Sequence, residues 1–338
     1  MREGRILRKD AMSIKSRLAR TIAPVIGFCA LAACSAAPEP QPVTDLRTLA
    51  ADEMAGRLVG TPGNARARAY ITQRYAEIGL EPVGGSFAHP FDFTRPTDFR
   101  DPGSAPVEMR GVNLIGMVEG SGAGDDVIVV TAHFDHLGPA EAGEIFNGAD
   151  DNASGVAALL AAAEAVSRRA PENDVMFVAF DAEEGGLNGA RAFMEDPPID
   201  ADRIAFNLNL DMVGYSPDGD LWAVGTYHYP VLEPIVARIA ENAAVELKMG
   251  FDRPTENRRN DWTLLSDHAP FHLAGVPFLY LGVEDHAHYH QPSDEFAVIP
   301  LDFFLGAVET ATMTLRAVDA ELDAITAAPS RIEADAGG

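Results

Sequence analysis

Two apolar runs, Val127–Thr131 and Val175–Phe180, constrain the fold of this chain more than any other feature. The first consists entirely of β-branched residues and the second is apolar throughout, which is typical of strands buried on both faces of a sheet. An Ala- and Leu-rich helical segment, Val156–Val166, lies between them. Because parallel strands are joined by helical crossovers, this order of strand, helix and strand predicts an α/β fold with parallel strands at its centre.

The alternation of strands and helices continues along the chain and favours one domain. Thr61 and Pro62 are typical of the N-cap and first position of a helix that would end at Gly79. We expect a domain over residues 45–326, with a mostly parallel central sheet and helices on both faces, and a flexible tail over 327–338. Further strands are expected over 87–93, 112–118, 204–210, 221–224 and 276–281, and further helices over 45–54, 187–194, 231–242 and 300–318.

The first 33 residues have the pattern of an export signal rather than of a folded segment. A Lys- and Arg-rich start is followed by a short apolar run, Thr21–Ala30, and then by small residues before Cys34. The sequence LAAC resembles a bacterial lipobox, so we expect cleavage before Cys34, lipid on its sulfur and a tether over residues 34–44. An ordinary signal peptide is the alternative, and Met12 is a second possible start. A lipoprotein on the periplasmic side of a bacterial membrane, the outer membrane being favoured, is the expected location.

Charge and cysteine content exclude several classes of function. The formal net charge is −25, so the surface repels phosphate backbones and nucleic acid is not an expected partner. The two cysteines are Cys29, within the signal, and Cys34. Their positions leave the expected domain without a thiol and exclude cysteine-protease chemistry. No apolar run after Cys34 is long enough to span a bilayer, so the lipid anchor is the expected membrane contact.

Metal-ligating residue types follow four of the predicted strands and precede one helix. Each group has an ordinary explanation when it is considered alone, such as a helix N-cap for Asp150–Asn152. However, the carboxyl ends of strands in such sheets meet at one edge, where active sites lie. Imidazole and carboxylate ligands without thiolate suit zinc in a hydrolytic site, and five ligand groups match two metals that share a bridging carboxylate. The groups contain His133, Asp150 or Asp151, Glu183 or Glu184, Asp211 and His290.

The motifs that carry these residues, taken together, resemble those of the co-catalytic zinc aminopeptidase family. That family also includes glutamate carboxypeptidase II and the glutaminyl cyclases. The resemblance covers roughly residues 127–296, and an earlier stretch, MAGRLVGTPGNARARAYI, is similar to the N-terminal helices of exported bacterial members. In chain order the motifs are AHFDHLG, GADDNASGVAALL, FVAFDAEEGGLNGARAF, LNLDMVG, SDHAPF and HYHQPSD.

The resemblance implies a ligand set for two zinc ions. His133 and Asp211 would hold one zinc, Glu184 and His290 the other, and Asp151 would bridge them. Asp151 is chosen over Asp150 because the family's bridging Asp lies three residues before a Ser-Gly pair. The family also implies a cis peptide bond after Asp151.

Neighbouring residues receive supporting roles from the same resemblance. Asp135 would hydrogen-bond the far nitrogen of His133 and fix its tautomer. Asp294, four residues after His290, matches an acidic position of the family motif. Of the three histidines in HAHYH only His290 has the required spacing, so His286 and His288 are expected to be loop histidines.

The implied reaction is hydrolysis of a peptide bond near a free amino terminus. Glu183 would act as the general base, taking a proton from a zinc-activated water, and the hydroxyl of Tyr289 would stabilise the oxyanion. The expected protein is an exported dizinc aminopeptidase that acts on peptides.

Three alternatives remain open at this stage. A dizinc carboxypeptidase or deacylase would need a lid domain between Asp211 and His290, where the chain is short. A glutaminyl cyclase would have no need of His133, which is present. A non-enzymatic metal-binding lipoprotein would be expected to lack a ligand or the base. No motif indicates the preferred substrate side chain or the oligomeric state.

Overall fold

The computed structural model describes residues 38–96, 103, 105–140, 142–255 and 260–331. Every helix and strand described belongs to one compact unit, Glu39–Gly338. The expected signal, Cys34 and most of the expected tail therefore lie outside the described residues. Among the described helices, none is both long enough and apolar enough to cross a membrane.

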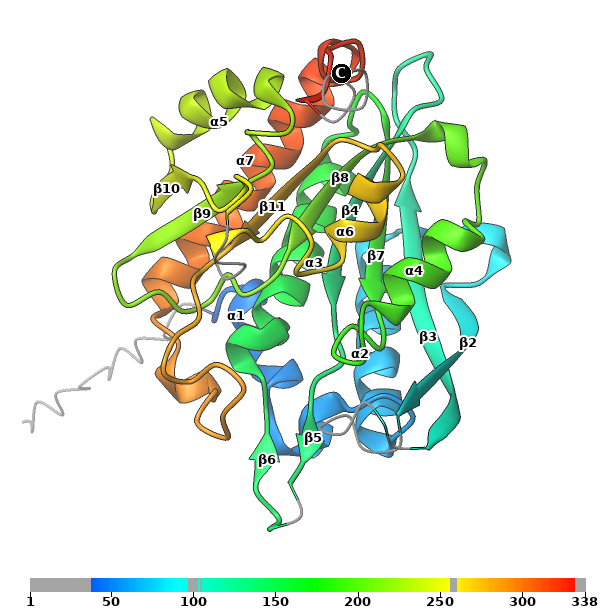
Figure 1. Ribbon diagram of the computed structural model, residues 1–338, viewed down its shortest axis with the longest axis vertical. Coiled ribbons are helices and arrows are strands. Elements are labelled where there is room, and N and C mark those ends of the chain that lie inside the picture. The colour runs from blue at the N-terminus through cyan, green and yellow to red at the C-terminus, as the bar shows by residue number, and fades with distance from the viewer. Residues whose placement is uncertain (1–37, 97–102, 104, 141, 256–259, 332–338) are drawn as a thin grey trace, which may run out of the picture. The chain divides into compact units, whose positions relative to one another are not determined.

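A mixed sheet forms the centre of the described fold, and its central strands are parallel, as the sequence predicted (Figure 1). Strands β7, β4, β8 and β11 run parallel to one another, whereas β3 on one side and β9 on the other pair antiparallel with this group. The strand order is β1-β3-β7-β4-β8-β11-β9-β10, with β2 paired to β3. The bounds are β1 Glu81–Pro82, β2 Ala88–Pro96, β3 Pro106–Val118, β4 Val127–His133, β7 Asp174–Phe180, β8 Ile204–Leu210, β9 Asp220–Val224, β10 Glu246–Met249 and β11 Phe278–Gly282.

Helices cover both faces of the sheet, because successive side chains of the central strands point to opposite sides. In β4, Ile128 and Val130 join one buried apolar cluster, whereas Val127 and Val129 join another. The larger cluster takes in α1 Gln41–Leu49, α2 Pro62–Ile78, α3 Gly155–Arg168, α5 Glu233–Ala240 and α7 Leu301–Thr326. The smaller one takes in α4 Asn188–Glu195 and α6 His268–Leu273.

Helix α2 has the ends that the sequence predicted. The Thr61 hydroxyl accepts a hydrogen bond from the backbone N–H of Asn64 at 3.3 Å, which caps the first turn. Gly79 ends the helix with φ of +86°, a conformation that costs glycine little. Ile71 and Tyr75 are buried in the larger cluster, so this helix anchors the N-terminal part of the domain to the sheet.

The N-terminal segment differs from the prediction of one helix over residues 45–54. Helix α1 begins earlier and ends at Leu49, and a 3₁₀ segment, Asp52–Arg57, follows it. Ala55 and Gly56 have positive φ values of 48° and 65°, so the chain cannot continue as a regular helix. The turn delivers the side chain of Arg57 into the interior, where it is fully buried.

Some short elements were not predicted. Strand β10 has four residues with a mixed polar pattern, and it forms by pairing parallel to β9. Helix α6 has six residues and contains Pro270. The two-residue strands β5 Gly138–Pro139 and β6 Ile145–Phe146 pair with each other and extend away from the main sheet in Figure 1.

Candidate metal centre

The five predicted metal ligands come together at the carboxyl ends of the parallel strands. His133 is the last residue of β4, Asp211 follows β8, and Glu184 lies in the loop after β7. Asp151 lies in a tight π-helical turn, Ala149–Ser154, just before α3, and His290 lies in the loop after β11. Strands β4 and β7 are parallel with His133 opposite Phe180, so the loops that follow them are neighbours.

Asp151 faces two histidines at once. Its Oδ1 lies 3.4 Å from His133 Nε2, and its Oδ2 lies 3.1 Å from His290 Nε2. Each histidine also faces a second carboxylate. Asp211 Oδ1 is 3.3 Å from His133 Nε2, which gives a first group of His133, Asp151 and Asp211. Glu184 Oε2 is 3.3 Å from His290 Nε2, which gives a second group of His290, Asp151 and Glu184. Asp151 therefore has one oxygen in each of two sites.

These distances fit zinc. Zinc binds nitrogen and oxygen at about 2.0–2.2 Å, so two ligands on one tetrahedral zinc are separated by roughly 3.3–3.6 Å. The separations within the two groups are 3.1–3.4 Å. Burial makes such a cluster of carboxylates costly without a cation, because like charges repel strongly in a low dielectric. The donor set and its spacing thus suit two candidate metal sites.

The turn that carries Asp151 is held by Asp294. The buried carboxylate of Asp294 accepts hydrogen bonds from the backbone N–H groups of Asp150 at 2.9 Å and Asp151 at 3.0 Å. Burial raises the pKa of Asp294 to about 6. The peptide bond between Asp151 and Asn152 is cis, as the resemblance implied. Asp294 thus positions the residue between the two sites.

Asp150 points away from the candidate metal sites. Its Oδ1 accepts from the backbone N–H of Gly214 at 2.6 Å and of Tyr215 at 3.1 Å, and its Oδ2 lies 2.8 Å from His286 Nε2. His286 lies in a loop, as expected, but its imidazole is buried and paired rather than solvated. His288 contacts the hydroxyl of Ser293 at 3.0 Å and has no contact with the five ligands.

The predicted contact between the Asp135 carboxylate and His133 is wrong in its detail. His133 Nδ1 lies 3.8 Å from the Asp135 carboxylate, which is too far for a hydrogen bond, and it donates instead to the main-chain oxygen of Asp135 at 3.2 Å. The carboxylate accepts from the backbone N–H of Glu183 at 3.0 Å. Asp135 therefore orients His133 through its backbone and the Glu183 loop through its side chain.

The adjacent residues Glu183 and Glu184 have opposite electrostatics. Burial and the negative charges of Glu184 and Asp267 raise the pKa of Glu183 well above its usual range, against the opposing charge of His133. Burial and the negative charge of Asp151 also raise the pKa of Glu184. The imidazoles of His136 and His290 have the opposite effect and outweigh them, so that the pKa of Glu184 is lowered. Glu184 is thus held as a carboxylate, whereas Glu183 is suited to hold a proton.

Several residues of the centre were not predicted from the sequence. The Ser266 hydroxyl donates to Asp211 Oδ2 at 2.6 Å, and the Tyr280 hydroxyl donates to the backbone oxygen of Asp211 at 3.0 Å. Asp267, in the SDHAPF motif, is buried, and neither of its carboxylate oxygens has a hydrogen-bond partner among the described residues. His136 is also buried and contacts Glu184 at 2.6 Å. Ser266, Asp267 and His136 lie in the recognised motifs and Tyr280 lies in β11, but the motifs did not indicate which atoms meet.

Tyr289 is placed beside the centre. Its ring stacks on His290 with 4.0 Å between ring centroids, and burial raises the pKa of its hydroxyl. No described contact tests its predicted role in stabilising an oxyanion, which stays a prediction.

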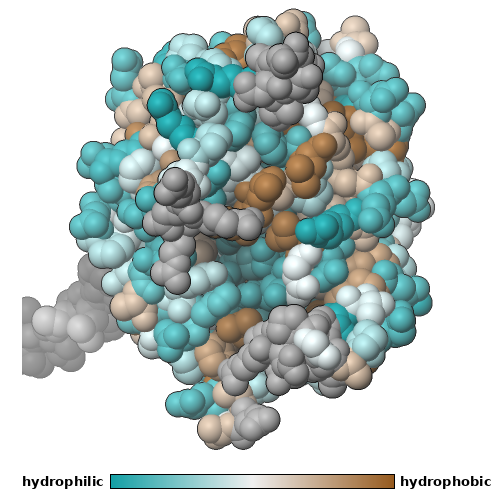
Figure 2. All heavy atoms as spheres, in the orientation of Figure 1, coloured by the Kyte–Doolittle hydropathy of each residue, from teal (hydrophilic) through white to brown (hydrophobic). Residues whose placement is uncertain are grey.

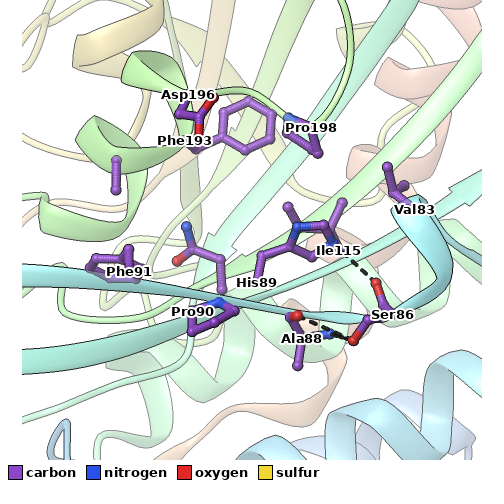
Figure 3. A pocket seen from close by; sticks show the side chains of 13 residues that line it. Val83, Ser86, Ala88, His89, Pro90, Phe91, Ile115, Phe193, Asp196 and Pro198 are labelled. Atoms are coloured by element: carbon purple, nitrogen blue, oxygen red, sulfur yellow. Dashed lines mark hydrogen bonds between the residues drawn. The ribbon is translucent and has the colours of Figure 1, made fainter.

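A hollow in the surface lies away from these residues. It has a volume of about 350 Å³ and lies between Phe193 and Pro198 on one side and Ala88 and Pro90 on the other (Figure 3). None of the predicted metal ligands lines it.

In Figure 2 the face seen in Figure 1 is mostly hydrophilic, which agrees with the net charge of −25.

Solved structures share this fold. A zinc aminopeptidase from Bacillus subtilis superposes with a TM-score of 0.64 at 17% identity, covering 81% of this chain and 94% of that one. A Bacteroides thetaiotaomicron glutaminyl cyclase superposes with a TM-score of 0.63 at 18% identity, covering 82% of this chain and 96% of that one. At such identities the similarity establishes the fold alone.

Curated relatives are similar over part of their length. The chain is 31% identical to Aminopeptidase YwaD of Bacillus subtilis over 154 residues, which cover 45% of this chain and 30% of that protein. It is 33% identical to the Probable lipoprotein aminopeptidase LpqL of Mycobacterium tuberculosis over 177 residues, covering 48% of this chain and 33% of that protein. The chain thus spans about a third of the length of these two relatives.

The pattern of a known family covers the centre and most of the sheet. It matches residues 113–314, which include every metal ligand predicted above and more than half of the sequence. The match is described as peptidase family M28. Because this match covers more than half of the sequence, the chain belongs to peptidase family M28.

Proposed function

We propose that this protein is a dizinc aminopeptidase that removes residues from the free amino terminus of peptides. The observation that carries the proposal is the position of Asp151, whose two oxygens each lie within 3.4 Å of a different histidine. His133 and Asp211 would hold one zinc ion, and Glu184 and His290 the other. When bound, the zinc pair would supply an activated water and polarise the scissile carbonyl.

Glu183 is the proposed general base. One of its oxygens lies in a group with His133 and Asp211 whose ligand atoms are all within 4.8 Å of one another, so it borders the site without taking part in the Asp151 bridge. Its raised pKa favours a proton acceptor that can release the proton again to the leaving amine. The N–H of Glu183 is fixed by Asp135, which positions the carboxylate.

Tyr289 is the proposed oxyanion donor. Its hydroxyl is protonated at neutral pH, since its pKa is raised, and can therefore donate to a developing negative charge. The stacking of its ring on His290 would keep it next to that ligand.

An aminopeptidase is favoured over the related activities. The chain between β8 and β11 forms β9, α5, β10 and α6, which belong to the sheet and its covering helices, so little chain remains for the lid of a carboxypeptidase or deacylase. A single-zinc cyclase would not need the His133–Asp211 pair, which has ligand spacing here. Two of the similar curated proteins are named aminopeptidases, which also supports this choice.

Export and lipidation at Cys34 are part of the proposal. They rest on the basic and apolar segments before LAAC, and the relative named a probable lipoprotein aminopeptidase supports them. Mass spectrometry of the membrane-extracted protein should find a lipid-modified N-terminal Cys34, and Cys34→Ala should release the protein from the membrane fraction. An unmodified mature N-terminus elsewhere would contradict this location.

The activity is tested with three substrate classes. Aminoacyl-p-nitroanilides and unblocked peptides should be hydrolysed, whereas N-acetylated peptides should not, and a zinc chelator should abolish the reaction. Hydrolysis from the carboxyl terminus, or equal hydrolysis of blocked and unblocked peptides, would overturn the assignment. If zinc is bound and no substrate in the panel is hydrolysed, the protein is a metal-binding member without peptidase activity.

A further inference from the structure

His136 is a buried residue of the centre to which the ligand assignment gives no role. It lies three residues after His133 in the motif AHFDHLG, and its side chain is fully buried. Its Nδ1 lies 2.6 Å from Glu184 Oε1 and 3.8 Å from Asp151 Oδ2. It therefore reaches the same site as His290 but from the opposite side of Glu184.

The distance between His136 Nδ1 and Glu184 Oε1 shows whether the two atoms are hydrogen-bonded or are spaced as two ligands of one metal. Two ligands on one tetrahedral zinc are separated by roughly 3.3–3.6 Å, and Glu184 Oε2 and His290 Nε2 are 3.3 Å apart. The separation of 2.6 Å between His136 Nδ1 and Glu184 Oε1 is instead that of a strong hydrogen bond. His136 thus contacts one oxygen of Glu184, while the other oxygen faces His290.

The proton of this hydrogen bond belongs to His136. An ionised carboxylate only accepts, so Nδ1 must donate, and a neutral imidazole then carries no proton on Nε2. In agreement, His136 Nε2 is buried and has no hydrogen-bond partner among the described residues. In this tautomer Nδ1 carries the proton that it donates to Glu184, so Nδ1 has no lone pair with which to bind a metal.

The backbone around His136 fixes its ring. A Cβ at Gly148 would lie 2.6 Å from His136 Cδ2, so only glycine leaves room for the imidazole. The carbonyl of Gly148 accepts a hydrogen bond from Arg57 Nη2 at 2.9 Å, which holds the backbone beside the His136 ring in place. The His136 and His290 rings are 5.8 Å apart and tilted, so they do not compete for one position.

We propose that His136 is a positioning residue, which donates to Glu184 Oε1 so that Glu184 binds its metal through Oε2 alone. This inference rests on the proposed metal centre and does not depend on which bond the enzyme hydrolyses. A glutamate without this donor could rotate and bind its metal through both oxygens. The residue would thus fix which oxygen of Glu184 faces the metal.

Three substitutions separate the proposal from direct ligation. Asn places its amide nitrogen where histidine has Nδ1, whereas Gln places it near Nε2, and Ala has no donor. We expect His136→Ala and His136→Gln to weaken binding of one zinc ion by about 10–100-fold, the range for residues that orient metal ligands. His136→Asn should stay within a few-fold of the wild type. His89→Ala, in the separate cavity of Figure 3, is the matched control and should change nothing.

The measurements are zinc stoichiometry, zinc affinity by competition with a chromophoric chelator, and the visible spectrum of the Co²⁺-substituted full-length protein. Circular dichroism checks that each variant is folded. If His136→Asn loses zinc as strongly as His136→Ala, or if its cobalt spectrum reports a lost nitrogen ligand, the imidazole is itself a ligand and the proposal is wrong. Wild-type affinity in both His136→Ala and His136→Gln would also overturn it. Zinc binding without peptidase activity would refute the proposed function and leave this test intact.

Discussion

Two neighbouring glutamates with the same side chain have different chemistry here because of what faces each of them. Glu184 lies between the imidazoles of His136 and His290, which lower its pKa. Glu183 borders the carboxylates of Asp211 and Asp267, which raise its pKa together with burial. The first arrangement suits a permanent negative charge, and the second suits a group that gains and loses a proton.

This division predicts the behaviour of two variants. Glu183→Gln should keep both metals, because the neutral amide lowers the repulsion among the carboxylates, and should lower kcat by about 10²–10⁴-fold, the usual contribution of a general base. Glu184→Ala should lose metal as well as activity. Metal analysis and steady-state kinetics on both variants check this, and full activity in Glu183→Gln would show that another group is the base.

That the five candidate ligands lie together was predictable at this scale, but most of the contacts around them were not. Each predicted ligand has a residue type and a motif position that depend on the sequence alone. The contacts of Asp135 depend on whether its carbonyl or its carboxylate reaches His133, a difference between 3.2 and 3.8 Å that no spacing reports. The buried pairing of His286 with Asp150 likewise needs the fold, because the two residues are far apart in the sequence.

At the scale of elements, Arg57 joins α1 to the loops of the metal centre. Its guanidinium donates to the backbone oxygens of Leu49 at 2.7 Å, Phe134 at 2.8 Å and Gly148 at 2.9 Å. It also donates to the backbone oxygen of Asn147. Burial lowers its pKa to about 10, against the attraction of the surrounding carboxylates. The MAGRLVG stretch therefore supplies an internal cation that holds two loops together.

Replacing this arginine should destabilise the fold even when the charge is kept. Lysine has one ammonium group and cannot reproduce a fork that spans four carbonyl groups, so Arg57→Lys should lower the free energy of unfolding by about 2–4 kcal/mol. Urea unfolding of the metal-free protein measures this. Arg66→Lys is the control, since Arg66 is exposed and donates to a single backbone oxygen, and its effect should lie within about 0.5 kcal/mol.

Helix α6 carries two buried histidines that make stability depend on pH. Burial lowers the pKa of His268 to about 3 and that of His272 to about 4. Their pKa values in the unfolded chain are about 6.5, so below that pH the unfolded chain binds protons that the native state does not. Stability should therefore be complete above pH 6.5 and fall towards pH 4, by at most about 1.4 kcal/mol per pH unit for each histidine.

A variant of His272 separates the pH dependence that comes from the histidines from the pH dependence that comes from buried carboxyl groups. The pKa of Asp181 is raised by burial to about 6, so that group acts in the opposite direction and gains stability as the pH falls. His272→Asn keeps a side-chain amide that can hydrogen-bond the Tyr229 hydroxyl, which lies 3.0 Å from His272 Nδ1, and removes one titrating group. The loss of stability between pH 7 and pH 5 should be smaller in this variant than in the wild type. An equal loss in the two metal-free proteins would exclude His272 as a source.

The bounds of the central strands were predictable because these runs are largely apolar, but those of the longest helix and strand were not. Helix α7 continues to Thr326, past the predicted end at residue 318, and β3 begins at Pro106, before the predicted start at residue 112. Strand β8 has the predicted bounds, and β4 and β7 are extended by at most two residues, because these runs are buried on both faces. Strand β10 forms only beside β9, and the break after Leu49 comes from positive φ values in the turn at Ala55 and Gly56. Neither feature has a periodic pattern in the sequence.

For the whole molecule, the metal centre is a concentration of buried negative charge. The carboxyl groups of Asp135, Asp150, Asp151, Asp211, Asp267 and Asp294 are all buried around it. Cations that bind the native state stabilise it in proportion to the logarithm of their concentration over the Kd, about 1.4 kcal/mol for each tenfold. The overall α/β architecture was predictable from the apolar pattern, whereas the expectation that metal stabilises the fold comes from this buried cluster.

Metal removal should lower the thermal stability. We expect a chelator to lower the Tm by at least about 4 °C, since one to two kcal/mol shifts the Tm of a domain of this size by several degrees. Added zinc should restore it. Asp151→Asn combined with Glu184→Ala removes ligands from both sites, so the Tm of that variant should not respond to the chelator. A Tm of the wild type that is insensitive to the chelator would show that the ligands are not coupled to the fold.

The dependence of Asp151 on Asp294 also sets an order of events in synthesis. The backbone N–H groups at residues 150 and 151 are held by a carboxylate that the ribosome adds more than a hundred residues later, and His290 comes only shortly before it. A growing chain can therefore hold the Asp150–Asp151 turn only after Asp294 has been added, and we expect a fragment that stops before residue 294 to leave these two N–H groups without that acceptor. We therefore expect a metal that uses Asp151 to bind only after the chain has folded.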